Sequence, residues 1–172
     1  MSNPLDMDYI MNNVLLVVDT RNLFNTLHKT FGNGKIDYQR YCELVGGQDH
    51  IYSHIAYGQQ CENNSVNFIT VLNKLGFVCK FKQLVRNAGK TLYFDSNVQL
   101  AIDVTEQVSA GKIDRVVLGS SDPALIDLID WIRKTKGLRC DIVACRIPKV
   151  LKDACSMFIE LDSTILLKPI TE

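Results

Sequence analysis

Residues 13–19 read NVLLVVD, an unbroken apolar run that ends in a carboxylate at Asp19. A run without polar alternation is typical of a strand covered on both faces, so we expect a central strand of a parallel sheet here. A second such run, RVVLGSSD at residues 115–122, ends in small polar residues and Asp122. These two runs and the turns that follow them decide the expected fold and the expected place of the chemistry.

The rest of the chain alternates short apolar runs with segments whose apolar residues recur at helical spacing. This alternation predicts a three-layer α/β/α fold with a mostly parallel, doubly wound sheet. Residues 86–90, Arg-Asn-Ala-Gly-Lys, are expected to form a polar loop. Helices are expected at 21–31, after Asp37, and at 65–75, 97–109, 123–136 and 147–155, and further strands at 51–57, 77–84, 138–145 and 157–161.

Length and composition limit the function classes. A chain of 172 residues with 47% hydrophobic residues suits one domain, 1–172, with its core at about 13–162. The 19 basic residues balance the 19 acidic ones, so an anionic partner must be bound by a local patch. No apolar run reaches the roughly 20 residues of a membrane helix, and the six cysteines form no CxxC pair. We expect a cytoplasmic protein without a membrane partner. The sequence is compatible with a homo-oligomer and does not decide the oligomeric state.

Ligands of open parallel sheets bind beyond the carboxyl ends of the strands, where the winding reverses. Aspartates gathered at such an edge repel one another unless a divalent cation shares them, and oxygen ligands suit Mg²⁺ or Mn²⁺. The side chains expected there are Asp19, Arg21 and Asn22 after the first run, Ser120 and Asp122 after the second, and Asp95 and Asn97 where the helix at 97–109 begins.

Four segments carry a family resemblance: VLLVVDTRN, FDSNVQLAIDV, VVLGSSDPALIDLI and DACSMFIELD. In order and spacing they resemble the NYN domains, the LabA-like branch of the PIN-type metal-dependent ribonucleases, from Asn13 to about Asp162. The resemblance implies a PIN-like, Rossmannoid fold and a phosphodiesterase that uses Mg²⁺ or Mn²⁺ to cleave RNA. It implies catalytic roles for Asp19, Asn22, Asn97, Ser120 and Asp122, and metal ligation by Asp19 and Asp122. Asp95, two residues before Asn97, is expected as a substitute metal ligand.

Two of the four carboxylates of the family pattern are replaced by neutral residues, and Pro123 stands where the family has a phenylalanine. Asn97 and Ser120 stand where the family has aspartates, so Asp19 and Asp122 offer about half of the usual negative charge. The Asn97 carbonyl and the Ser120 hydroxyl can still coordinate a cation, whereas the Arg21 guanidinium could neutralise Asp19 without one. The alternative is therefore a degenerate domain that binds RNA, nucleotide or a protein partner without hydrolysis.

Several polar side chains also suit structural roles that need no ligand. Asp122 stands before a proline and is a good helix N-cap, and Asn97 is equally suited to capping. Asp103 lies six residues after Asn97, on another face of the helix, and is expected to pair with a surface lysine or arginine. A receiver-like regulatory domain would share the acidic edge, but it needs a lysine at the end of the fifth strand, where this chain has Arg146 and Lys149.

Basic and aromatic residues precede the helix at 97–109. Lys82, Arg86 and Lys90 are expected, together with Arg21, to contact phosphates, and Tyr93 to stack on an unpaired base. The alternative for the lysines is an edge strand whose charges prevent other sheets from joining. The predicted partner is RNA, bound along the segment that leads into the acidic edge.

Overall fold

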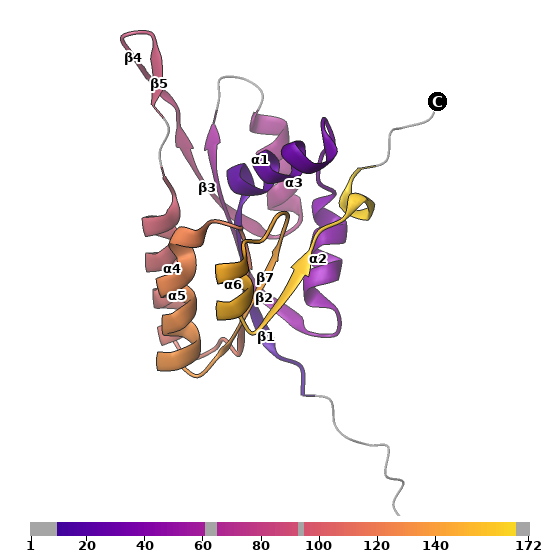
Figure 1. Cartoon of the computed structure of the whole chain (residues 1–172), viewed down its shortest axis with the longest axis vertical. Helices are drawn as coiled ribbons and strands as arrows, with labels where there is room; N and C mark the ends of the chain where they lie inside the picture. Colours follow the sequence, from indigo (N-terminus) through magenta and orange to yellow (C-terminus); the bar gives the residue numbers. More distant parts are fainter. Residues whose placement is uncertain (1–9, 61–64, 93–94, 168–172) are drawn as a thin grey trace, which may run out of the picture.

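The computed structural model describes residues 10–60, 65–92 and 95–167, without the side chains of residues 65, 85–87 and 90–92. Its centre is a six-stranded sheet in the order β3-β2-β1-β6-β7-β8, in which every pair is parallel (Figure 1). The strands are β1 (Asn13–Asp19), β2 (His50–Gln60), β3 (Phe77–Gln83), β6 (Arg115–Gly119), β7 (Arg139–Ala144) and β8 (Met157–Glu160).

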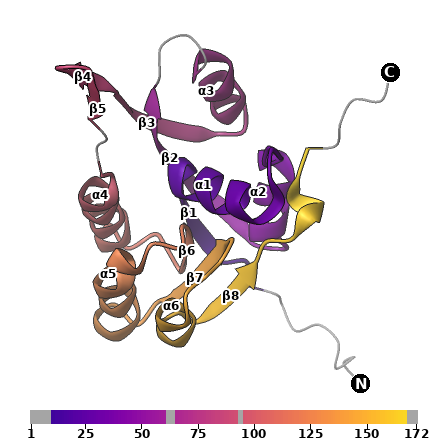
Figure 2. The ribbon, with the colours of Figure 1, turned by 45° about the horizontal axis from the view of Figure 1, so that its top comes forward.

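The helices cover both faces of this sheet, as Figure 2 shows. The chain winds outward from β1 to β3, returns to β6 beside β1, and then winds the other way, so right-handed crossovers place the two sets of helices on opposite faces. The expected three-layer fold is confirmed. One layer holds α1 (Thr20–Phe31), α2 (Tyr38–Gly46) and α3 (Ser65–Lys74), and the other α4 (Asn97–Ser109), α5 (Ile126–Asp130) and α6 (Lys149–Ala154).

Short turns complete the helical layers. The single helix expected at 123–136 is a succession of a 3-10 turn, η1 (Pro123–Leu125), then α5, and then a π-helical turn, η2 (Trp131–Thr135). A last 3-10 turn, η3 (Ser163–Ile165), follows β8. No helix in the described part of the chain is long and apolar enough to cross a membrane.

Strand β1 is the centre of the core. Its residues 14–18 have no exposed surface, because β2 and β6 flank it and helices cover it above and below. The pairing sets Val18 opposite Gly119 of β6 and Asp19 opposite Tyr57 of β2. The carboxyl ends of β1 and β6 therefore lie side by side at one edge of the sheet.

The segment expected to be a polar loop is a β-hairpin. Strands β4 (Val85–Asn87) and β5 (Lys90–Leu92) pair antiparallel and project away from the main sheet. Both turn residues have positive φ, Ala88 at 47° and Gly89 at 77°, the signature of a two-residue type I′ turn. Alanine rarely adopts this conformation, so the sequence lacked the usual Asn-Gly signal of such a hairpin.

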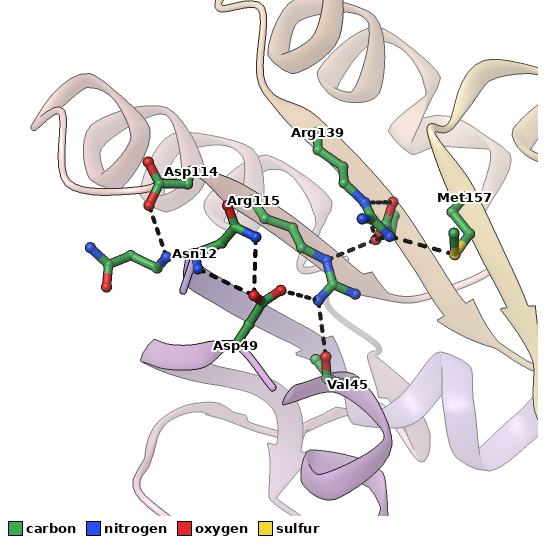
Figure 3. Close-up of polar contacts among 9 residues, drawn as sticks. Asn12, Val45, Asp49, Asp114, Arg115, Arg139 and Met157 are labelled. Carbon is green, nitrogen blue, oxygen red and sulfur yellow. Dashed lines mark hydrogen bonds and ion pairs between the residues drawn. The ribbon is translucent and has the colours of Figure 1, made fainter. Parts of the chain in front are cut away.

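An ion network joins the amino-terminal ends of β6 and β7, opposite the site edge (Figure 3). The Arg115 guanidinium donates from Nε to Asp141 Oδ2 at 2.8 Å, and from Nη1 to Asp49 Oδ2 and to the Val45 carbonyl at 3.1 Å each. Arg139 binds the same Asp141 carboxylate from its exposed side. Arg115 and Asp141 are buried, and Arg115 compensates the charge of Asp141 together with Arg139 and that of Asp49 alongside it.

An Arg115→Met substitution should lower the free energy of unfolding by about 3–5 kcal/mol, because it leaves the buried carboxylates without their shared guanidinium. Urea denaturation measures this change. The control is Lys149→Met, which breaks the exposed Lys149–Asp153 pair and should cost less than about 0.5 kcal/mol. Equal effects of the two substitutions would contradict the central place given to Arg115.

Candidate active site

A cleft of about 340 Å³ opens at the carboxyl ends of β1 and β6, where the direction of winding reverses and open α/β sheets bind ligands. Four segments of the chain line it: the turn into α1, the end of β2, the loop before α4 and the turn after β6. Among the lining side chains are Asp19, Arg21, Asn22, Asp95 and Asp122, all of them expected from the sequence.

Asp19 is held in place by the helix that it caps. Its Oδ1 accepts hydrogen bonds from the backbone N–H groups of Arg21 and Asn22, at 3.0 Å each. The pKa of Asp19 lies above its ordinary value, chiefly because of burial and to a smaller extent because of the charge of Asp122. The two backbone hydrogen bonds and the charge of Arg21 act in the opposite direction but do not outweigh these effects. The charged form of Asp19 is therefore less favourable here than it is in water, and the Asp122 carboxylate lines the same cleft.

Asn22 connects the two turns that form the cleft. Its Oδ1 accepts hydrogen bonds from the backbone N–H of Ser121 at 2.9 Å and from the Ser121 hydroxyl at 3.1 Å. The turn after β1 is therefore tied to the turn after β6, although 99 residues separate the two partners. This contact gives Asn22 a positioning role that needs no ligand.

Asp122 caps a helical turn and also lines the cleft, and its role as a metal ligand stays a prediction. Its Oδ1 accepts from the Ala124 N–H at 2.9 Å and caps η1, while the carboxylate lines the cleft. The Asn97 amide donates from Nδ2 to Asp122 Oδ2 at 2.9 Å. The Asn97 Oδ1 atom is buried and has no hydrogen-bond partner among the described residues. The Asn97 side chain thus does not cap α4. It supplies a hydrogen-bond donor to the Asp122 carboxylate.

Ser120 and Asp95 form hydrogen bonds within their own turns, and Asp95 but not Ser120 lines the cleft. Ser120 is buried, and its hydroxyl oxygen accepts from the Asp122 N–H at 3.3 Å within the same turn. Asp95 lines the cleft, but its Oδ1 accepts from the Asn97 N–H at 2.7 Å. Within residues 10–60, 65–92 and 95–167, no three acidic, histidine or cysteine side chains form a group that could hold a metal. Asp19, Asp95 and Asp122 are thus not gathered in one such group here, and metal ligation by Asp95 stays a prediction.

Glycine is required where β6 ends. A Cβ at Gly119 would come within 2.6 Å of the Tyr41 hydroxyl oxygen and 3.1 Å of Val18 Cγ2. The Tyr41 hydroxyl lies there because it donates to the Val143 carbonyl at 2.7 Å. A larger residue would displace this tyrosine and the turn that carries Asp122.

Asp103 pairs with a lysine, as expected, but the expectation of a surface position is wrong. The residue is 6% exposed and accepts hydrogen bonds from Tyr57, from Lys80 at 2.8 Å and from Gln99 at 3.1 Å. Burial would raise the pKa of Asp103, but the bonds from Lys80, Tyr57 and Gln99 outweigh it and hold the pKa below its ordinary value. The sequence carried a signal for burial, since Asp103 follows the core residue Leu100 by three positions.

Of the residues expected to bind RNA from the segment before α4, the structure describes the side chain of Lys82. Lys82 is exposed, and its Nζ lies 3.5 Å from the Asp95 backbone carbonyl, near the cleft. Tyr93 and the side chains of Arg86 and Lys90 lie outside the described part of the structure. Lys80, on the same strand as Lys82, is engaged by Asp103 and is not available for a phosphate.

Fold and site together define a doubly wound α/β domain with a cleft at its switch point that three carboxylates line, those of Asp19, Asp95 and Asp122. The NYN domain family model matches residues 13–162, and the chain belongs to this family, which is part of the PIN-like nuclease superfamily. A protein of unknown function from Vibrio parahaemolyticus RIMD 2210633 has a similar crystal structure, with a TM-score of 0.81 and 20% identity over 97% of this chain and 100% of that chain. No curated protein matches the sequence.

An Asp19→Asn variant should be more stable than the wild type at neutral pH in EDTA, because asparagine caps a helix equally well without a buried charge. The folded-state pKa of Asp19 lies above 3.8, so the protonated side chain favours the folded protein. This contribution to the free energy of unfolding is complete below pH 3.8 and is lost as the pH rises through the folded-state pKa. The gain in Tm of the variant should therefore grow from acid toward neutral pH in thermal denaturation. A gain that shrinks over this range would contradict the raised pKa.

Proposed function

We propose that the cleft is the active site of a phosphodiesterase that cleaves RNA with one Mg²⁺ or Mn²⁺ ion held by Asp19 and Asp122. The observation that supports this most is that the carboxylates of Asp19 and Asp122 line one cleft at the reversal point of the sheet, where burial first, and then the charge of Asp122, raise the pKa of Asp19 and disfavour its ionised form. A cation shared by the two would remove this cost. NYN domains belong to a superfamily whose nucleases generally depend on divalent metal ions.

The residues present fit such an ion. Mg²⁺ is commonly bound through one or two carboxylates, with water in the remaining positions. Asp19 and Asp122 meet this requirement. Asn97, whose amide nitrogen binds Asp122, would contribute its oxygen, which is buried without a partner among the described residues. A bound ion would polarise the phosphate and make water a better nucleophile.

The protein's own groups would hold the two carboxylates in place and orient the RNA. The backbone N–H groups at the start of α1 fix the Asp19 carboxylate, and the Asn22–Ser121 contact fixes its distance from the turn that carries Asp122. Arg21 lines the same cleft and offers a positive charge to the phosphate that is cleaved. Lys82 would bind a neighbouring phosphate beside the loop at Asp95.

One observation favours a second function, RNA binding without hydrolysis. The Asn97 amide already satisfies one oxygen of Asp122, as a cation would, so the site holds together without a metal. In this case the cleft would bind RNA through the same positive groups, and divalent cations would have no effect on the affinity.

The Asp19→Asn and Asp122→Asn variants should each lose Mn²⁺-dependent cleavage of a labelled single-stranded RNA by roughly a hundredfold or more. Gel analysis of the products measures the rates. Asp127→Asn, the same change at a position of α5 outside the cleft, is the matched control and should leave the rate unchanged. RNA binding by the wild type without any cation-dependent product would instead identify the non-hydrolysing domain.

An Asn97→Asp variant should bind Mn²⁺ more tightly and cleave RNA faster, since it adds a carboxylate beside Asp122. Without cation the added charge faces Asp122 and should lower Tm; Mn²⁺ should restore it by binding only the folded state. Thermal denaturation with EDTA and with Mn²⁺ measures both effects. Asn73→Asp, on the exposed side of α3, controls for the extra charge, and an Asn97→Asp variant as insensitive to Mn²⁺ as this control would argue against a metal site.

A further inference from the structure

We propose that the exposed face of α1 beside the cleft is a stacking platform for an unpaired RNA base, and that the Phe24 ring is its surface. The inference rests on the proposed function insofar as it takes RNA as the molecule in the cleft. It adds a binding subsite on α1, away from the β3–β5 segment where the sequence places RNA contacts. It also specifies the substrate as single-stranded.

Phe24 has no role in the core that would explain a phenylalanine. Helix α1 buries Thr20, Leu23 and Leu27 against the sheet, whereas Phe24 remains 57% exposed. The His28 ring lies against it, with ring centroids 5.9 Å apart and planes inclined by 15°. A ring held by a near-parallel neighbour loses little conformational freedom when a third ring stacks on it, so the platform is preorganised.

The platform is continuous with the cleft. Arg21, Phe24, Asn25 and His28 follow the i, i+3, i+4, i+7 spacing and therefore share one face of α1. Arg21 and Asn25 line the cleft, so the Phe24 ring projects from the helix turn next to the cleft wall. One turn corresponds to about 5.4 Å along the helix axis, a distance that a single nucleotide spans. Helix α1 lies over β1 and β2 (Figure 2), at whose carboxyl ends Asp19, Gly58 and Gln59 line the cleft.

Chemistry selects an unpaired base as the occupant. Aromatic rings stack on the faces of all four bases, while cationic side chains bind the adjoining phosphates. Here the phosphate would lie in the cleft near Arg21, and the base of the same nucleotide or its neighbour on Phe24. In a duplex the base faces are already covered by their neighbours. The arrangement thus favours single-stranded over double-stranded RNA, with little preference for sequence.

Phe158 provides a matched comparison. It is an exposed phenylalanine at 43% on β8, at the far end of the sheet from β2. Its ring is covered by the Lys152 amine, with Nζ 5.0 Å from the ring centroid. Phe158 is an exposed phenylalanine like Phe24, but it does not lie beside the cleft. The Phe158→Ala variant therefore shows how much RNA affinity is lost merely by removing an exposed aromatic ring elsewhere on the protein.

The test measures binding of a fluorescein-labelled single-stranded RNA by fluorescence anisotropy in EDTA, so that no cleavage takes place. Phe24→Ala should weaken binding roughly 5- to 100-fold, Phe24→Trp should retain or improve it, and Phe158→Ala should leave it unchanged. RNA with abasic sites should bind the wild type and Phe24→Ala equally, since no base remains to stack. Duplex RNA should show no dependence on Phe24.

The outcomes separate this inference from the proposed cleavage. Equal binding by the wild type, Phe24→Ala and Phe24→Trp overturns the platform, even where Asp19→Asn abolishes cleavage. Phe24-dependent binding that vanishes on abasic RNA supports the platform, even where no cation yields products. A wild type that neither binds nor cleaves RNA overturns both. A loss of binding by Phe24→Ala that persists on abasic RNA also overturns the platform, because it assigns the effect to the fold or to phosphate contacts.

Discussion

The two hydrogen bonds from Ser121 to Asn22 Oδ1 are the constraint on which the site depends. Strands β1 and β6 run side by side because both are buried apolar runs, but parallel pairing alone does not fix how their following turns approach each other. The Asn22 side chain closes that gap, since it lies in the first turn of α1 and binds the backbone of the turn after β6. Asp19 and Asp122, which lie close to these two residues in the sequence, are thereby held in the lining of one cleft.

This cleft contains an electrostatic conflict that the fold resolves only in part. Backbone N–H groups at the start of α1 stabilise the ionised Asp19, yet burial and Asp122 act against it. At Asp122 the Asn97 amide supplies a positive dipole, and its own oxygen remains without a partner among the described residues. The Asp122 carboxylate thus has a hydrogen-bond donor in Asn97, whereas the pKa of Asp19 stays above its ordinary value. The first contact suits a cleft that binds without a metal, and the second suits a site that binds a cation.

Much of this arrangement follows from the sequence, and the exceptions have physical reasons. Uninterrupted apolar runs at β1 and β6 predicted their burial, and the reversal of winding predicted where Asp19 and Asp122 meet. The contact between Asn97 and Asp122 was not predictable, because it depends on how α4 is oriented over the sheet. Asp103 was misplaced because a charged residue on the buried stripe of a helix needs partners from β2 and β3, which only the tertiary structure supplies. The β4–β5 hairpin was missed because Ala88 adopts a left-handed backbone conformation.

That hairpin has a consequence for how such a domain can diversify. Strands β4 and β5 hydrogen-bond to each other and form a sheet separate from the six-stranded one. Lengthening, shortening or replacing them leaves the register of the main sheet unchanged, so such changes carry little risk to folding. They would alter the surface that leads into α4 and Asp95 at the rim of the cleft. Evolution can thus exchange what the domain recognises while the buried strands, and the carboxylates at their ends, stay as they are.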